Sequence, residues 1–363
     1  MKRYYVISAV AAMALVLGAC GGNSELRMIV GTYTDTDSEG LYSLAFDEET
    51  GEARLLDSCR VDNPSYLTLS DDGRHIYAVS EMHDDEAAVV ALTFDPASGG
   101  FEVIDSRKTR GADPCYVATN GKIVVTANYG GSMSVFPITA DGGVGEMSDF
   151  YEGGIGGSDS MRQCVPHVHC TEFAPDGRHL YVSDFSADRL LVFAVTDNGV
   201  EQLKTCVDVA ADNGPRHIVF DRSGKHAYVI GELSGLVTVL DVDGAGMSVR
   251  QVVDADPGDA RSAADLHLSP DGRFLYASVR QPSDCITIYS VDGTTGELTE
   301  TGRQKTGLHP RNFNITPNGK YLLCACRDSD RIDVYRIDTA TGMLTDTGRP
   351  IMLPRPVCVK WAR

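Results

Sequence analysis

The chain has 363 residues and is strongly acidic, with 51 Asp and Glu against 32 Lys and Arg and a formal net charge of −19. Such a charge repels nucleic acid and anionic lipid surfaces, so neither is expected as a partner. It gives no long-range attraction for a carboxylate or phosphate either, so any anion site must be built locally from Arg and His side chains.

The first twenty residues predict export. A positive start is followed by an apolar run from Val6 to Leu17, which is too short to span a bilayer and is typical of a signal peptide. The small residues before Cys20 resemble a lipobox, in which this cysteine becomes the lipidated first residue; an ordinary secretory signal is the alternative. We predict a lipoprotein signal peptide at 1–19, a tether at 20–26, and a cell-envelope location, periplasm-facing or at the cell surface, with Cys20 as the only membrane anchor.

One turn motif recurs along the rest of the chain. It places a glycine before Arg or Lys, mostly after Asp or Asn, and β-branched and aromatic residues flank it. The glycines stand at positions 73, 121, 177, 224, 272 and 319, so four steps are 47 or 48 residues long and one is 56. A glycine there supplies the positive φ of a tight hairpin, and its flanks predict two strands.

A third and a fourth strand follow each hairpin, as at residues 286–289 and around the turn at 294–298. Four antiparallel strands in about 47 residues are the signature of a β-propeller blade. No long amphipathic helical pattern competes with this interpretation.

The two ends of the chain predict one further blade. Residues 28–33 look like a second strand without its first, and residues 41–46 and 55–58 follow as third and fourth strands. Residues 355–360 look like a first strand without successors. We therefore predict an all-β fold, a single seven-bladed propeller over residues 27–363, whose last blade is closed by strands from both termini and leaves no open sheet edge.

Blade topology predicts where polar side chains converge. The innermost strands begin, and the second strands end, at the same mouth of the central channel. Eight residues before the turn glycines stand Ser65, Asp113 (or Cys115, because the register of this blade is open), His169, Arg216, Ala264 and Arg311. Eight residues after them stand Glu81, Tyr129, Phe185, Glu232, Arg280 and Arg327. Titratable groups from separate blades at one channel mouth are typical of a small-molecule site.

Histidines and cysteines are candidate metal ligands. His167 and His169 share one strand face, but no spacing nominates a third ligand, so no metal site is predicted. Nine cysteines follow Cys20 without a metal-like CxxC pair. Most are expected to be buried thiols, and a disulfide between two of them is the alternative in an oxidising compartment.

Eight stretches in order cover essentially the whole mature chain: Val30-Gly31-Thr32-Tyr33-Thr34, Asn63-Pro64-Ser65-Tyr66-Leu67, Ala127-Asn128-Tyr129-Gly130-Gly131-Ser132, Pro166-His167-Val168-His169, Gly214-Pro215-Arg216-His217, Gly231-Glu232-Leu233, Ala264-Asp265-Leu266-His267 and His309-Pro310-Arg311-Asn312-Phe313. With these the chain resembles the seven-bladed propeller lactonase family, which includes bacterial 6-phosphogluconolactonases and is similar to fungal carboxymuconate-lactonizing enzymes.

The resemblance implies four catalytic residues. A His, an Arg, a Glu and a second Arg have been proposed for the lactonizing relatives, and the matching positions are His169, Arg216, Glu232 and Arg280. We therefore predict a lactone hydrolase acting on a sugar lactone without a cofactor. His169 would be the general base, Glu232 would orient it or relay the proton, and the two arginines would stabilise the oxyanion and hold an anionic group.

Five further residues are expected to contact the substrate or line the channel, namely Glu81, Tyr129, His167, Arg311 and Arg327. Because phosphorylated sugar lactones are scarce outside the cytoplasm, the export signal leaves open whether the lactone is phosphorylated. A second hypothesis is a non-catalytic, envelope-tethered propeller that holds a sugar acid or a peptide in the same funnel.

Overall fold

The recurring glycines form the hairpins that the sequence predicts. In the computed structural model, which describes residues 25–362, Gly73, Gly177 and Gly272 have φ values of 66°, 65° and 73° and connect the first two strands of their sheets. A side chain at such a φ is strained, so glycine keeps these turns tight.

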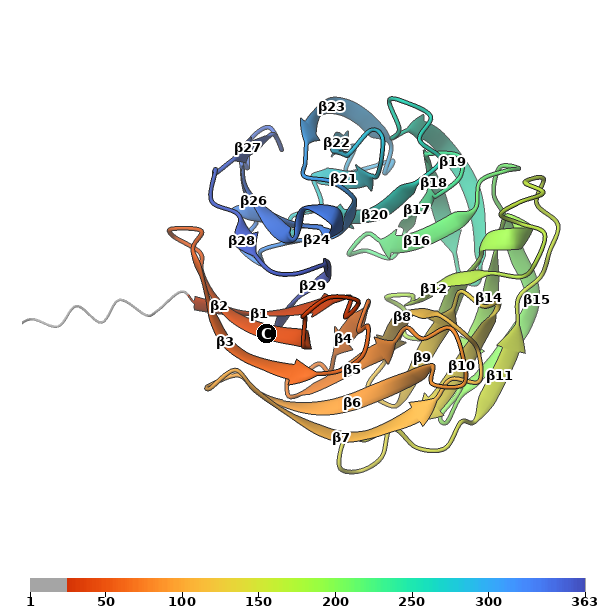
Figure 1. Cartoon of the computed structure of the whole chain (residues 1–363). Coiled ribbons are helices and arrows are strands. Elements are labelled where there is room, and N and C mark those ends of the chain that lie inside the picture. Colours follow the sequence, from red (N-terminus) through yellow and green to blue (C-terminus); the bar gives the residue numbers. More distant parts are fainter. Residues whose placement is uncertain (1–24, 363) are drawn as a thin grey trace, which may run out of the picture.

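Seven antiparallel sheets are arranged in a ring around a central axis and form a β-propeller, as predicted (Figure 1). We number the blades 1 to 7. From the innermost strand outward, blade 1 consists of β29 (Pro356–Ala362), β1 (Glu25–Thr32), β2 (Gly40–Asp47) and β3 (Ala53–Arg60), blade 2 of β4 (Leu67–Leu69), β5 (His75–Ser80), β6 (Ala88–Asp95) and β7 (Gly100–Lys108), and blade 3 of β8 (Pro114–Thr119), β9 (Ile123–Asn128), β10 (Ser132–Pro137) and β11 (Asp149–Glu152). Blade 4 consists of β12 (Val168–Phe173), β13 (His179–Asp184), β14 (Arg189–Val195) and β15 (Val200–Asp208), and blade 5 of β16 (Pro215–Phe220), β17 (His226–Gly231), β18 (Leu236–Asp243) and β19 (Gly246–Asp254). Blade 6 consists of β20 (Ala263–Leu268), β21 (Phe274–Val279), β22 (Cys285–Val291) and β23 (Leu298–Lys305), and blade 7 of β24 (Pro310–Ile315), β25 (Tyr321–Cys326), β26 (Arg331–Ile337) and β27 (Leu344–Asp346), with β28 (Ile351–Met352) also paired to β26.

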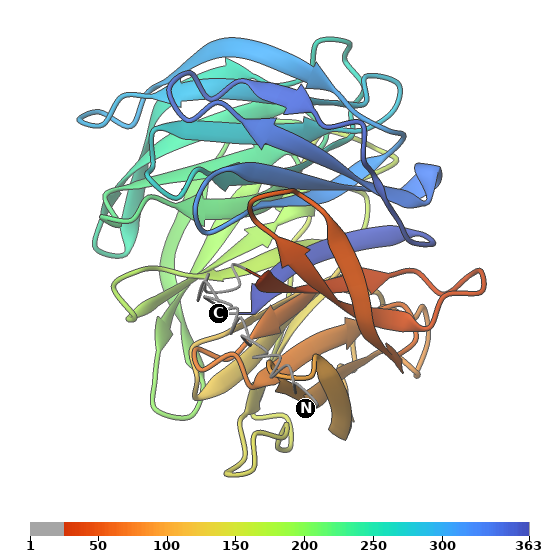
Figure 2. The ribbon, with the colours of Figure 1, turned by 90° about the vertical axis from the view of Figure 1, so that its left-hand side faces the viewer.

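Blade 1 is closed by strands from both ends of the chain, which confirms the predicted split blade. β29 pairs antiparallel with β1, with Met28 opposite Trp361 and Val30 opposite Val359. Figures 1 and 2 both show the blue C-terminal strand beside the red N-terminal one. β1 begins at Glu25, three residues before the start that the sequence pattern indicated.

Four buried tyrosines join neighbouring blades. Each stands four residues after a turn glycine, and its hydroxyl donates to the carbonyl of a glycine in the outer hairpin of the next blade. The pairs are Tyr77 to Gly142, Tyr181 to Gly244, Tyr228 to Gly296 and Tyr276 to Gly342, at 2.9–3.1 Å. The tyrosine of the repeated turn motif therefore also sets the spacing between blades.

The nine cysteines among residues 25–362 are all free thiols. Six of them are buried, which confirms the expectation for most: Cys115, Cys170, Cys285, Cys324, Cys326 and Cys358. The helical elements of these residues are two short 3₁₀ turns, η1 (Phe185–Ala187) and η2 (Arg327–Ser329). Within this part of the chain no helix has the length and apolar character needed to cross a membrane.

Removing the last strand tests how far the fold depends on closure. Deleting residues 354–363 removes the innermost strand of blade 1, which leaves β1 with an open edge and uncovers the face of blade 7 that packs on β29. We therefore expect loss of soluble protein that unfolds cooperatively. Thermal unfolding against a chain of residues 25–363 measures this. A truncated chain that melts like the reference would contradict the closure argument.

Candidate active site

A β-bulge at the start of the inner strands points side chains into the channel. The pairing of β12 with β13 shifts register between Val168 and Cys170, so His169 lies in the bulge. The same shift places Arg216 in the bulge of β16 and Arg311 in that of β24. Bulges commonly redirect a side chain beside an active site. We call this mouth of the channel, where the inner strands begin, the rim.

A ring of backbone hydrogen bonds fixes the second set of rim residues. Each of seven residues directly after a second strand donates its N–H to a carbonyl two positions before the inner-strand rim residue, at 2.8–3.2 Å. These donors are Tyr33, Glu81, Tyr129, Phe185, Glu232, Arg280 and Arg327. The eight-residue count from the turn glycines placed six of them correctly.

The same ring decides between the two alternatives in blade 3. The N–H of Tyr129 donates to the carbonyl of Asp113, so the rim position two residues later is Cys115. Cys115 lies in the bulge of β8 and is buried. The Asp113 carboxylate instead meets His83 at 2.7 Å. Cys115 therefore holds the place that the sequence analysis first gave to Asp113.

Glu232 gathers three arginines at the rim. Its carboxylate lies 3.0 Å from Arg216 Nε, 3.0 Å from Arg280 Nη2 and 2.6 Å from Arg162 Nη2. Arg216, Glu232 and Arg280 are 1%, 6% and 7% exposed. Burial alone raises the pKa of Glu232, but Arg280, Arg216 and Arg162 outweigh it and lower the value to about 2. Burial lowers the pKa of Arg280 to about 10, against the opposing effect of Glu232. Both groups are therefore charged near neutral pH.

His169 lies beside this cluster as a buried, neutral imidazole. It is 3% exposed, and its ring packs edge-on against Tyr129 and His217, at 5.8 Å and 5.4 Å between centroids. Its Nδ1 has no hydrogen-bond partner among the described residues. Burial holds the pKa of His169 well below its usual value, and the charges of nearby arginines, Arg216 foremost, lower it further.

Residues 27–361 match the protein family described as "Lactonase, 7-bladed beta-propeller". The chain belongs to this family.

Relatives and solved structures cover nearly the same length. A protein of Formosa agariphila named 6-phosphogluconolactonase is 32% identical over 312 residues, which are 82% of this chain and 88% of the relative. A Bacteroides fragilis structure described as a candidate 6-phosphogluconolactonase is 46% identical with a TM-score of 0.92, over 94% of this chain and 99% of that one. A periplasmic gluconolactonase of Pseudomonas aeruginosa is 29% identical with a TM-score of 0.89, over 94% and 99%.

Arg162 belongs to the Glu232 cluster of this propeller lactonase, although the sequence did not predict it. It lies on the segment 153–167, the fifteen-residue link between β11 and β12 and the longest link between blades; the others have eight residues or fewer. Its Nη2 reaches both Glu232 and the hydroxyl of Tyr129, the latter at 3.2 Å. The segment is also tied down where Asp159 meets Arg261 at 2.6 Å. The one long step of the repeat, 56 residues, was the available signal.

Of the five predicted substrate contacts, His167 and Tyr129 lie beside the Glu232 cluster. The rings of His167 and Tyr129 stack at 4.1 Å, and the imidazole Nδ1 lies 2.5 Å from the Tyr129 carbonyl.

Glu81 and Arg311 form a second group with Tyr33. The carboxylate of Glu81 accepts from the Tyr33 hydroxyl at 3.1 Å and lies 3.6 Å from Arg311 Nη2. The Arg311 guanidinium also lies over the Tyr33 ring, 5.5 Å from its centroid. Counting eight residues from the turn glycines did not find Tyr33. The first strand of its blade comes from the other end of the chain, so no turn glycine precedes Tyr33. Arg327, the fifth residue, is engaged by Asp328 at 2.7 Å.

One predicted contact is not found. Glu232 forms no hydrogen bond with His169 in the part of the chain that the structure describes; its oxygens are taken by arginines. Glu232 therefore positions Arg216 and Arg280, not the imidazole. Within residues 25–362 no group of three or more His, Cys, Asp and Glu side chains is arranged to hold a metal ion.

The neutral histidines predict a pH dependence of stability. Burial lowers the pKa of His217 to about 3 and of His309 to about 2, and the pKa of His169 is also depressed. Since the unfolded values are near 6.5, the unfolded chain binds more protons, and the stability that these groups contribute above pH 6.5 is lost as the pH falls. Each histidine costs about 1.4 kcal/mol of unfolding free energy per pH unit in that window.

Calorimetry at pH 5.5 in buffers of different ionisation enthalpy measures the effect. We expect unfolding to take up about two protons net, because some buried carboxyls oppose the histidines, and a His169→Gln variant to take up about one fewer. A net release of protons would contradict the assignment of neutral, buried histidines.

Proposed function

We propose that this propeller lactonase hydrolyses a sugar lactone at the rim, with His169 as the base. The observation that carries the proposal is the placement of a buried, neutral imidazole beside a carboxylate-linked group of arginines drawn from separate segments. The names of the relatives, 6-phosphogluconolactonase and gluconolactonase, support the reaction class.

The charges at the rim suit an ester carbonyl. Arg216 Nη2 and Arg280 Nη1 have no protein partner among residues 25–362, while their other nitrogens are held by Glu232 and by backbone carbonyls. His217 Nε2 also lies 3.1 Å from Arg216 Nη1. Two donors fixed in this way can meet the negative charge that develops on the lactone oxygen, with little reorganisation during the reaction.

The proposed reaction moves one proton through His169. The imidazole takes a proton from water as the water oxygen bonds to the carbonyl carbon, and the carbonyl oxygen becomes an oxyanion facing Arg216 and Arg280. Collapse of this intermediate breaks the ring C–O bond, and the imidazolium returns the proton to the leaving alkoxide. The product is an open-chain hydroxy acid.

An anionic substrate would strengthen this base. Burial, and after it the charges of nearby arginines, keep the pKa of His169 low in the free protein. A carboxylate or phosphate placed among those arginines offsets their charge and so removes that part of the lowering of the pKa. Arg162, with 40% of its side chain exposed, is the arginine best placed to meet such a group.

The second hypothesis, a propeller that only binds a sugar acid or peptide, is less well supported because the relatives are named as enzymes. Turnover against a panel of phosphorylated and unphosphorylated γ- and δ-lactones separates the two. Tight binding without turnover of any lactone would favour the binding protein.

Substituting the base tests the catalytic assignment. We expect His169→Ala to lower kcat for the best lactone roughly 100-fold or more, because proton transfer to a positioned base is lost. Arg216→Lys is expected to be costly too, since an ammonium cannot replace the planar guanidinium that bonds Glu232. His179→Ala is the matched control, because His179 opens β13 beside the turn, bonded to Asp176. Equal activity of wild type and His169→Ala would overturn the assignment.

We also propose an envelope location with a signal peptide at 1–19 and a lipid on Cys20, a residue outside the described part of the chain. The tether expected at 20–26 is shorter than the sequence indicated, because Glu25 and Leu26 already belong to β1. The periplasmic gluconolactonase relative supports the compartment. Cys20→Ser is expected to move the protein from membranes into a soluble envelope fraction, because the acyl chains are the proposed anchor. Fractionation followed by immunoblotting measures it, and continued membrane association would mean that another anchor exists.

A further inference from the structure

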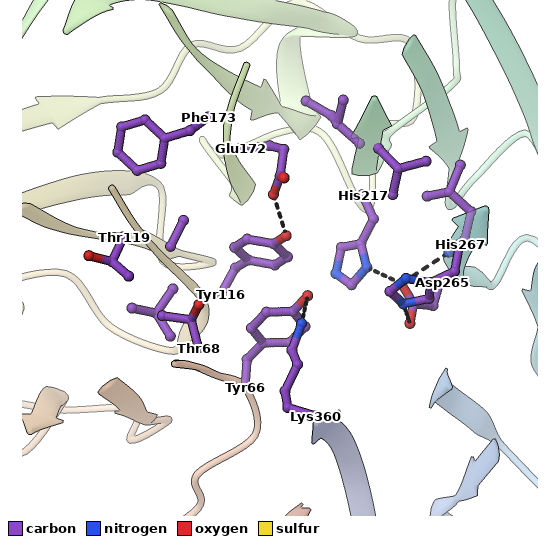
Figure 3. A pocket seen from close by; sticks show the side chains of 15 residues that line it. Tyr66, Thr68, Tyr116, Thr119, Glu172, Phe173, His217, Asp265, His267 and Lys360 are labelled. Atoms are coloured by element: carbon purple, nitrogen blue, oxygen red, sulfur yellow. Dashed lines mark hydrogen bonds and ion pairs between the residues drawn. The ribbon is translucent and has the colours of Figure 1, made fainter. Parts of the chain in front are cut away.

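The channel has a second mouth, where the inner strands end, and a cavity of about 370 Å³ lies there (Figure 3). Its polar lining comes from later positions of the inner strands than the rim residues do, so the far mouth is a separate location. The volume lies within the range of small-molecule pockets, about 300–1,000 Å³. None of the groups proposed for lactone hydrolysis lines it.

A closed layer of side chains separates the two mouths. Tyr66, Tyr116, His217, Asp265 and Asn312 follow the rim positions directly along their strands, and none is more than 6% exposed. The rings of Tyr66 and Tyr116 stack at 4.1 Å, and His217 packs edge-on against both. A ligand in the far cavity therefore does not reach His169 through the channel.

Lys360 brings to one wall a positive charge that no carboxylate of the described residues bonds directly. Its ammonium donates to the Tyr66 hydroxyl at 3.0 Å and lies 4.3 Å from the centre of that ring. Among the described residues no carboxylate lies within 4.0 Å of it, and no other hydrogen bond of this ammonium is formed. A half-buried cation in this setting is stabilised by an anion that enters from solvent.

Glu172 lies on another wall, as Figure 3 shows, and among the described residues it forms no ion pair within 4.0 Å. One carboxyl oxygen accepts from the Tyr116 hydroxyl at 2.8 Å, and the other has no partner within residues 25–362. Burial raises the pKa of Glu172. A carboxyl group in this setting can both accept hydrogen bonds from hydroxyl groups and donate to them.

His267 adds a third polar group, and Asp265 fixes it in place. The Asp265 carboxylate meets His267 Nε2 at 3.1 Å and His217 Nδ1 at 2.7 Å and accepts from Asn312 at 2.6 Å. This carboxylate is fully used, so it holds the wall rather than a ligand. The Nδ1 of His267 has no partner in the described chain and remains for a hydroxyl group of the ligand.

We propose that the far cavity binds a small polyhydroxylated carboxylate, with the carboxylate on Lys360 and the hydroxyl groups on Glu172 and His267. The cavity offers one cation that no carboxylate bonds, and other walls carry groups that can bond hydroxyls. This arrangement matches the chemistry of such a ligand. Open-chain sugar acids, the product class of the reaction proposed above, belong to this group. Recognition at this site does not depend on that reaction.

Calorimetric titration with gluconate tests the site. The experiment uses the mature chain carrying Arg280→Met, so that binding at the rim is weakened. We expect gluconate to bind this protein, and Lys360→Met in the same background to lower the affinity tenfold or more. Glucitol, which lacks the carboxylate, and propionate, which lacks the hydroxyl groups, are expected to bind at least tenfold more weakly than gluconate. Lys320→Met is the matched control, because Lys320 lies outside the channel, paired with Glu49.

Gluconate affinity unchanged by Lys360→Met, or no gluconate binding at all, would overturn the proposal, as would equal binding of the three probes. Thermal unfolding checks that each variant is folded. If Lys360→Met does not fold, Glu172→Gln serves in its place, because it keeps the shape and the acceptor for Tyr116 while removing the acidic proton. None of these measurements involves lactone turnover, which the lactone panel measures separately. A protein that turns over no lactone but binds gluconate through Lys360 would therefore contradict the proposed hydrolase function and leave this site standing.

Discussion

The pairing of β29 with β1 is the contact on which both ends of the channel depend. It places the last residues of the chain against the first strand, so that seven inner strands close into a ring. β29 then supplies Val357 at the rim and Lys360 at the far mouth. Closure is therefore a requirement of stability, because it removes the open edges, and also of function, because both mouths include residues of the closing strand.

Burying charge is the second constraint. Arg216 and Glu232 are almost fully excluded from water, and each is tolerable only because the other is charged and bonded to it. Removing one partner of a buried pair costs about 3–5 kcal/mol, because the remaining charge is left unpaired. Arg280 and Arg162 add positive charge beyond what one carboxylate balances. Burial lowers the pKa of His169, and the charges of Arg216 and Arg280 lower it further. The excess of positive charge also provides the attraction that the acidic chain as a whole lacks for an anionic substrate.

Much of the rim followed from the sequence because blade repeats have a constant length. Counting from turn glycines placed His169, Arg216, Glu232 and Arg280 in one ring, since equal spacing in seven similar sheets means equal height along the channel. The count failed where the repeat is irregular. Tyr33 belongs to a blade whose turn is replaced by the closure, and Cys115 precedes a hairpin with a shorter turn than the others. Arg162 reaches the rim from a link between blades, whose path no strand period specifies.

The bonding pattern and the protonation state lay beyond the sequence for a different reason. Equal height along the channel does not specify which side chain bonds Glu232. Arg216 and Arg280 carry several donors each and bond its carboxylate, whereas His169 does not. Likewise, the usual histidine pKa near 6.5 does not indicate the pKa of His169 in the folded protein, because that pKa depends on burial and on the charges around the imidazole.

The layer between the mouths shows how one residue can serve two sites. His217 packs against His169 on the rim side and lines the far cavity on the other. Its Nδ1 meets Asp265, and its Nε2 lies 3.1 Å from Arg216 Nη1. Because Asp265 fixes the imidazole, Nδ1 carries the hydrogen and Nε2 accepts from the guanidinium, which holds Arg216 in the plane that also bonds Glu232. The orientation of a rim arginine is therefore set from the middle of the channel, by a carboxylate that also positions His267 at the far mouth.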